Sequence, residues 1–141
     1  MVAMLILLIA PLYPADASEN KMAPQQIEGV IKVNAEGVIE KVTEIPSLVF
    51  IDARIKSDRM QGHIEGSISL PDEQTDCLTL KKLIPEHSTP ILFYCNGPKC
   101  GRSVTSSRVA HKCGYSTIYW FRGGIEEWKT KKFPLIKNRA R

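Results

Sequence analysis

A cysteine at the end of an apolar run is the residue of this chain best placed to act as a nucleophile. Cys95 follows the strand-like run Ile91–Tyr94 and opens a glycine-containing loop, behind which residues 104–112 have a helix-like pattern. Such a loop can turn several backbone N–H groups toward one point, and the helix start adds partial positive charge. A thiolate, a persulfide or a small oxyanion would be stabilised there, and the cysteine sulfur would be reactive near neutral pH.

Strands that alternate with helices must position this loop. We expect strands near residues 29–33, 47–52, 67–70, 91–94 and 116–120, and helices near residues 35–42, 75–84, 104–112 and 125–131. Asn34 is a plausible N-cap for the first helix. This order predicts an α/β fold with a mostly parallel sheet of about five short strands and helices on both faces. Ligands bind such sheets beyond the carboxyl ends of the strands, which is where Cys95 is expected.

Four segments of the chain resemble those of the rhodanese family, in the family's order and at similar intervals. They are residues 49–54, residues 62–68, the loop from Tyr94 to Ser103, and residues 120–128. Each segment alone would be a weak signal. Together they make residues 30–135 resemble a single rhodanese domain.

The resemblance implies a sulfurtransferase that needs no metal or organic cofactor. A rhodanese cysteine takes sulfur from thiosulfate, polysulfide or a similar donor, holds it as a persulfide, and passes it to cyanide or a thiol. The thiol acceptor could belong to a partner protein. Cys95 is the expected nucleophile because it directly follows the strand, as the family nucleophile does. The residues expected to hold the donor are Asn96, Gly97, Lys99, Cys100, Gly101, Arg102 and Ser103.

The loop departs from the usual family pattern. Six residues lie between Cys95 and Arg102, more than is common in rhodaneses, and one of them is Cys100. Cys100 is a candidate for a resolving thiol that pairs with Cys95, or for a spectator. It is also the alternative nucleophile.

Three alternatives to sulfur transfer fit the residues of the loop to different degrees. A phosphatase or arsenate reductase on the same fold is disfavoured, because the spacing from Cys95 to Arg102 is one residue too long and no histidine precedes Cys95. A persulfide carrier or binding module with little thiosulfate turnover stays open. A zinc site of Cys95, Cys100, His111 and Cys113 is disfavoured, because at about 1.5 Å per helical residue the second pair lies too far away.

A charged cluster is expected close to the site. The resemblance implies that Asp52, Arg54 and Asp58 play a structural part, with Arg54 pairing with Asp58. Arg59 stands where the family usually has an aromatic residue, so the packing around it should differ.

The remaining notable side chains are expected to be structural. His63 is interpreted as a hydrogen-bonded turn residue, and Trp120 and Trp128 as core or rim packing. Cys77 and Cys113 are expected to be isolated thiols, although an even cysteine count in an exported protein leaves a disulfide open.

The amino-terminal end of the chain predicts export and processing. Residues 2–12 are almost entirely apolar and Ala15 and Ala17 follow, which is typical of a secretory signal cleaved after Ala17. We therefore expect a signal peptide over 1–17, a linker over 18–27, a rhodanese-like domain over 28–136 and a basic tail over 137–141. This organisation predicts a periplasmic or secreted protein without a stable membrane span, and membrane-anchored or cytoplasmic locations are the alternatives.

The charge of the chain is modest and does not indicate nucleic-acid binding. The formal net charge is +4, and many of the bases lie near the carboxyl terminus. No aromatic residues are interleaved with Lys137, Arg139 and Arg141, so we interpret them as a solvated tail.

Overall fold

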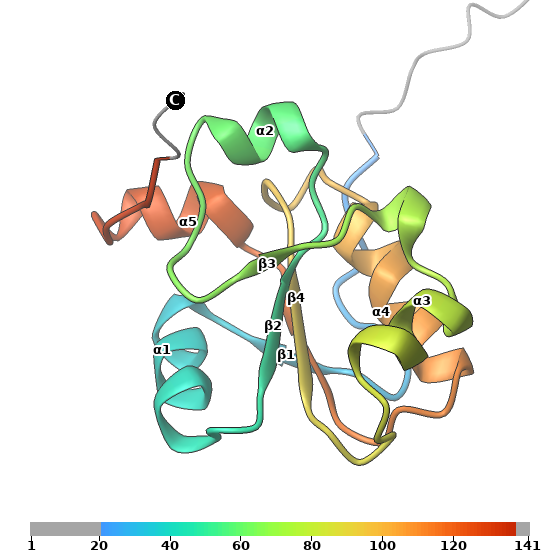
Figure 1. The fold of residues 1–141 in the computed structure, drawn as a ribbon. Coiled ribbons are helices and arrows are strands. Elements are labelled where there is room, and N and C mark those ends of the chain that lie inside the picture. The colour runs from blue at the N-terminus through green and yellow to red at the C-terminus, as the bar shows by residue number, and fades with distance from the viewer. Residues whose placement is uncertain (1–20, 138–141) are drawn as a thin grey trace, which may run out of the picture.

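Five parallel strands form one sheet in the computed structural model, which describes residues 21–137 (Figure 1). The strands are β1 (Ile31–Val33), β2 (Val49–Asp52), β3 (Ile68–Ser69), β4 (Ile91–Tyr94) and β5 (Ile118–Phe121). Their order across the sheet is β1-β5-β4-β2-β3, and every neighbouring pair is parallel. The predicted α/β class and the five-stranded parallel sheet are confirmed. The predicted signal peptide over residues 1–17 lies outside the described residues.

Helices cover both faces of the sheet, as expected (Figure 1). They are α1 (Ala35–Glu44), α2 (Lys56–Met60), α3 (Cys77–Leu83), α4 (Arg102–Lys112) and α5 (Gly124–Thr130), with a short 3-10 turn at Asp72–Gln74. The core on one face joins α1 and α5 to Phe50, Leu92 and Phe121. The core on the other face joins α3 and α4 to the strand residues that alternate with these, such as Ile91 and Phe93 of β4.

Helix starts agree with the caps that the sequence offers. The side chain of Asn34 accepts a hydrogen bond from Gly37 N at 2.8 Å, and that of Asp76 accepts one from Thr79 N at 2.7 Å. Both bonds satisfy N–H groups that the first turn of a helix leaves free.

The central strand of the sheet leads directly to the cysteine loop. All four residues of β4 are buried, which explains its uninterrupted apolar sequence. Cys95 follows at the carboxyl end of β4, between the ends of β2 and β5. The loop therefore lies beyond the carboxyl ends of the strands, which is where parallel α/β folds bind ligands.

The segment before β1 packs on the domain, although we expected a linker there. Ala23 and Ile27 are buried in a cluster with Val104 of α4 and Trp120 of β5. Within residues 21–137, no helix is long and apolar enough to cross a membrane.

Candidate active site

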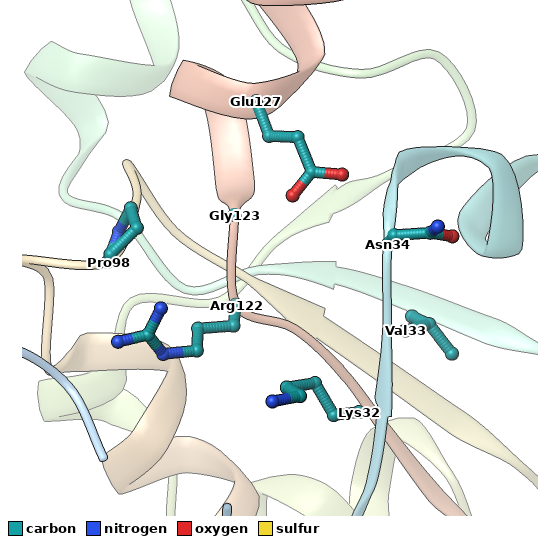
Figure 2. A pocket seen from close by; sticks show the side chains of 7 residues that line it. All are labelled: Lys32, Val33, Asn34, Pro98, Arg122, Gly123 and Glu127. Atoms are coloured by element: carbon teal, nitrogen blue, oxygen red, sulfur yellow. The ribbon is translucent and has the colours of Figure 1, made fainter. Parts of the chain in front are cut away.

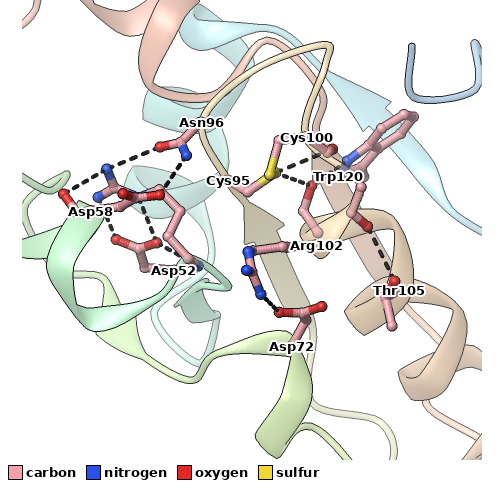
Figure 3. The surroundings of a disulfide bond; sticks show 12 residues. Asp52, Asp58, Asp72, Cys95, Asn96, Cys100, Arg102, Thr105 and Trp120 are labelled. Carbon is pink, nitrogen blue, oxygen red and sulfur yellow. Dashed lines mark hydrogen bonds and ion pairs between the residues drawn. A yellow bond between two sulfur atoms is a disulfide. The ribbon is translucent and has the colours of Figure 1, made fainter. Parts of the chain in front are cut away.

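The loop after β4 folds back on itself and joins its two cysteines in a disulfide. Cys95 and Cys100 are bonded, with their Cα atoms 6.3 Å apart (Figure 3). The reversal is a tight turn in which Cys100 N donates to Gly97 O at 2.9 Å. Pro98 occupies the second position of this turn, which suits its fixed φ angle. The sequence allowed such a pairing, and the turn brings the two Cα atoms within the distance that a disulfide requires.

The sulfur of Cys95 lies beneath the loop, next to a buried pair of polar side chains. Cys95 is only 1% exposed. The hydroxyl of Ser103 donates to Cys95 Sγ at 3.3 Å, and Trp120 Nε1 donates to Ser103 Oγ at 3.0 Å. Both partners are buried. Trp120, which we interpreted as packing alone, therefore also orients the hydroxyl that contacts the sulfur.

The first turn of α5 holds the start of the loop in place. Ile125 N donates to Cys95 O at 3.0 Å, and Glu126 N donates to Asn96 O at 2.8 Å. Gly124 lies so close to this peptide that a Cβ atom there would overlap the carbonyl of Cys95, and its φ of +53° also favours glycine. Gly124 thus allows the close approach of α5 to the loop.

A cavity of about 400 Å³ opens over the loop, next to the cysteines. It is lined by Asn96, Gly97, Lys99, Cys100, Gly101, Arg102 and Glu126. Six of the seven residues that we expected to hold a donor line this cavity, and the seventh, Ser103, lies on the Cys95 sulfur. Sequence reasoning did not single out Glu126, whose side chain packs against Gly97 and adds a carboxylate to the cavity.

The two cations of the cavity differ in their surroundings. Lys99 is exposed, and no acidic partner contacts it within residues 21–137. Arg102 forms an ion pair with Asp72 (Figure 3). Part of the charge that we expected Arg102 to offer to an anion is therefore offset by Asp72.

The side chain of Asn96 is hydrogen bonded to a charged cluster beside the loop. Asn96 Nδ2 donates to Asp58 Oδ2 at 2.7 Å (Figure 3). The expected ion pair between Arg54 and Asp58 is wrong, because the ion pair of Arg54 is with Asp52 at 2.7 Å. Arg54 reaches only the backbone oxygen of Asp58, at 3.3 Å. The carboxylate at the end of β2 is nearer to the guanidinium, which leaves Asp58 free to hold the loop through Asn96.

The buried carboxylate of Asp52 accepts hydrogen bonds from three side chains. Arg54, Arg59 and the hydroxyl of Tyr94 all donate to its carboxylate. Burial acts to raise the pKa of Asp52, but hydrogen bonds and the charge of Arg54 outweigh it and lower that pKa. Burial, with the charge of Asp52, raises the pKa of Tyr94. Buried charges are thus held together beside the carboxyl end of β4.

Arg59 and His63 fill the space around this cluster. Arg59 donates to Ser67 as well as to Asp52, which accounts for a cation where the family usually has an aromatic residue. The backbone of His63 bridges to that of Ile136, while its Nδ1 has no hydrogen-bond partner within the described residues. Burial and the nearby charge of Arg59 lower the pKa of His63. Among residues 21–137, His63 is hydrogen bonded through its backbone alone, and it does not line the cavity beside the cysteines.

The other two cysteines form a disulfide, so the expectation of isolated thiols is wrong. Cys77 begins α3 and Cys113 follows α4, and their Cα atoms lie 5.4 Å apart. The two helices pack on the same face of the sheet, which brings these residues together. Trp128 is a packing residue as expected, and its Nε1 donates to Pro134 O at 2.9 Å.

A second cavity, of about 570 Å³, is lined by Pro98 of the cysteine loop and by residues at the ends of β1 and β5 (Figure 2). Arg122 and Lys32 line it and donate to backbone carbonyls of residues 23–25. Ala23 N in turn donates to Pro98 O at 2.6 Å. Sequence reasoning missed this support, in which the segment before β1 is tied to the turn of the cysteine loop.

No three His, Cys, Asp or Glu side chains gather in a group that could hold a metal ion, as far as residues 21–137 are concerned. The groups present at the loop are the Cys95 and Cys100 sulfurs, the hydroxyl of Ser103, and the charges around the cavity.

Comparison with known proteins gives one family. The sequence model of the rhodanese-like domain matches residues 35–131. The chain is 30% identical over 105 residues to the rhodanese domain-containing protein CG4456 of Drosophila melanogaster, covering 67% of this chain and 93% of that protein.

Solved structures of the same fold share little sequence with the chain. The BH2092 protein of Bacillus halodurans superposes with a TM-score of 0.67 at 20% identity, over 76% of this chain and 77% of that one. A thiosulfate sulfurtransferase from Pseudomonas aeruginosa gives the same TM-score and identity, over 79% of this chain and 21% of that longer one. At such identities the likeness extends to the fold alone.

Proposed function

Because this chain belongs to the rhodanese-like domain family, we propose that it is a sulfurtransferase with Cys95 as its nucleophile. The observation that carries the proposal is the place of Cys95 at the carboxyl end of the central strand, beneath a cavity and in contact with Ser103. In the reduced protein, the Cys95 thiolate attacks the outer sulfur of thiosulfate or a related donor. Sulfite leaves with the bonding electron pair, and Cys95 holds the transferred sulfur as a persulfide. Attack by cyanide or a thiol on the outer sulfur then gives thiocyanate or a new persulfide and restores the thiolate.

Three features of the loop support this reaction. The Ser103 hydroxyl donates to the sulfur, and such a bond is stronger to a thiolate than to a neutral thiol. Exposed Lys99 attracts an anionic donor to the cavity. The bonds from α5 to the carbonyls of Cys95 and Asn96 fix the backbone, so the sulfur does not have to be positioned anew in each cycle.

Mass spectrometry of the reduced protein tests the proposal. Immediately after thiosulfate is added, and before any sulfide is released, the intact mass should increase by one sulfur atom, and a thiol added at that point should remove that sulfur. Peptide mapping should place it on Cys95, and Cys95→Ser should not gain it. A protein that keeps its original mass, with no sulfite released, would contradict the proposal. Sulfur loading without steady-state formation of thiocyanate would instead indicate a persulfide carrier.

We also propose that the protein is exported and processed after Ala17. The apolar run over residues 2–12 and the small residues Ala15 and Ala17 support this, and so do two cysteine pairs close enough to form disulfides. Amino-terminal sequencing of the protein from fractionated cells tests it. Recovery of an unprocessed chain would contradict cleavage.

A further inference from the structure

Several independent contacts hold Cys100 close to Cys95. The turn from Gly97 to Cys100 reverses the chain, and Ala23 holds that turn from outside through Pro98 O. Gly97 lies against the side chain of Glu126, where a Cβ atom would overlap the carboxylate. These contacts come from different segments of the chain. The approach of the two sulfurs is therefore a property of the folded loop and not of one flexible side chain.

Cys100 is also the thiol best placed to reach a sulfur atom on Cys95. Cys77 and Cys113 are bonded to each other and lie at the start of α3 and after the end of α4. Cys100 lines the cavity over the loop, and its Sγ can come within bonding distance of Cys95 Sγ. A persulfide formed on Cys95 would therefore have a second thiol beside it before any outside acceptor arrives.

We propose that Cys100 gives the protein a second activity, the release of hydrogen sulfide from the persulfide on Cys95. This inference rests on the proposed function, since Cys95 must first be loaded. The Cys100 thiolate attacks Cys95 Sγ, which is the inner sulfur of the persulfide. A bond forms between the two Sγ atoms, and the bond from Cys95 Sγ to the outer sulfur breaks. The outer sulfur leaves with the electron pair as sulfide, so the transferred sulfur is reduced and the two cysteines are oxidised to the disulfide.

The cycle is completed by an outside dithiol, either a small molecule or a protein with two neighbouring cysteines. Its thiolate attacks the Cys95–Cys100 disulfide, and its second thiol then releases the reduced loop as its own disulfide. Over one cycle, thiosulfate and a dithiol give sulfite, sulfide and a disulfide. The structure with Cys95 and Cys100 bonded is the state of the loop after sulfide has left. Without a reductant, the protein would release sulfide once and stop.

A single-turnover experiment tests the proposal. The full chain is reduced, freed of reductant and given thiosulfate without cyanide or added thiol, and sulfite, sulfide and free thiols are followed with time. The parent should release one sulfide for each sulfite and lose the Cys95 and Cys100 thiols together. Peptide mapping should then find the disulfide between them. In Cys100→Ser the sulfur should stay on Cys95, with sulfide release at least tenfold slower, until cyanide removes it as thiocyanate.

A matched control removes the other cysteine pair. Cys77→Ser with Cys113→Ser should release sulfide as the parent does, because neither residue lies at the loop. The proposal is overturned if the parent keeps its persulfide as long as Cys100→Ser does, or if mapping finds the sulfur on Cys100. These outcomes differ from a failure of the proposed function, in which no sulfite is released and no cysteine gains sulfur. Because the parent alone reports sulfide and the new disulfide, the test does not depend on how well Cys100→Ser folds.

Discussion

Trp120 Nε1 donates a hydrogen bond to Ser103 Oγ at 3.0 Å, and this bond fixes the direction of the serine hydroxyl. The indole nitrogen can only donate, so Ser103 must accept at this contact. Its own hydrogen is then available for Cys95 Sγ, 3.3 Å away. A buried tryptophan thus acts on the sulfur through one intervening hydroxyl.

Trp120→Phe should lower the reactivity of the Cys95 thiol in the reduced protein. Phenylalanine keeps most of the packing but cannot donate to Ser103, so the hydroxyl is free to turn away from the sulfur. We expect a loss of about 1 kcal/mol, or a roughly fivefold slower reaction of Cys95 with iodoacetamide at neutral pH. The pH midpoint of alkylation should move upward, and Ser103→Ala should show at least as large a change. A slower reaction with an unchanged pH midpoint would mean that Trp120 only packs.

Asn96→Ala should loosen the loop from the charged cluster beneath it. The change removes the 2.7 Å hydrogen bond to the half-buried carboxylate of Asp58. We expect a loss of about 1 to 3 kcal/mol in the free energy of unfolding and a lower kcat/KM for thiosulfate. Asp58→Asn is the matched control, because its amide oxygen can still accept from Asn96. Equal losses in the two variants would show that the charge of Asp58 matters and the link to Asn96 does not.

The sequence was sufficient to predict the strand that leads to the site and the position of Cys95 at its end. The apolar run Ile91–Tyr94 is β4 with its predicted bounds, and Asn34 is the N-cap it was expected to be. Both signals are local, because they depend on the pattern of one segment. The place of Cys95 at the carboxyl end of the central strand follows from the same local pattern and from the topology of parallel sheets.

What the sequence could not predict depends on distances between segments. Helix α2 was missed because it has five residues and buries none of them, so it carries no apolar stripe. Arg54 has acids at both Asp52 and Asp58, and only the folded backbone decides which one forms the ion pair. The pairing of Cys77 with Cys113 spans 36 residues and depends on how two helices pack.

Gly124→Ala should destabilise the protein strongly. A Cβ at this position would overlap the carbonyl of Cys95, and the positive φ of Gly124 adds about 1 to 3 kcal/mol of backbone strain. We expect a clear drop in the denaturant midpoint and a displaced cysteine loop. Gly101→Ala is the control, because no atom lies within 4 Å of a Cβ there and its φ is −85°. A parent-like midpoint for Gly124→Ala would contradict the close approach of α5 to the loop.

Lys99→Ala should weaken the use of thiosulfate more than Arg102→Ala does. Asp72 already offsets the charge of Arg102, whereas Lys99 is exposed and has no acidic partner among the described residues. We expect KM for thiosulfate to rise about threefold in Lys99→Ala, which is the size of an exposed charge interaction. The difference between the variants should shrink as salt is added, because salt screens exposed charges. A larger effect of Arg102→Ala would mean that its guanidinium leaves Asp72 to bind the donor.

Removing the Cys77–Cys113 disulfide should destabilise the folded chain without removing the fold. The bond closes a segment of 36 residues, and the loss of such a constraint on the unfolded chain costs about 2 to 4 kcal/mol. Leu80 and Ile84 still pack in the core beneath α3, so the helix should remain in place. Urea unfolding of Cys77→Ser with Cys113→Ser should show this loss relative to the oxidised parent. In the presence of a strong reductant the parent should lose most of its advantage. If the oxidised parent and the double variant unfold at the same urea concentration, the two thiols are not joined in solution.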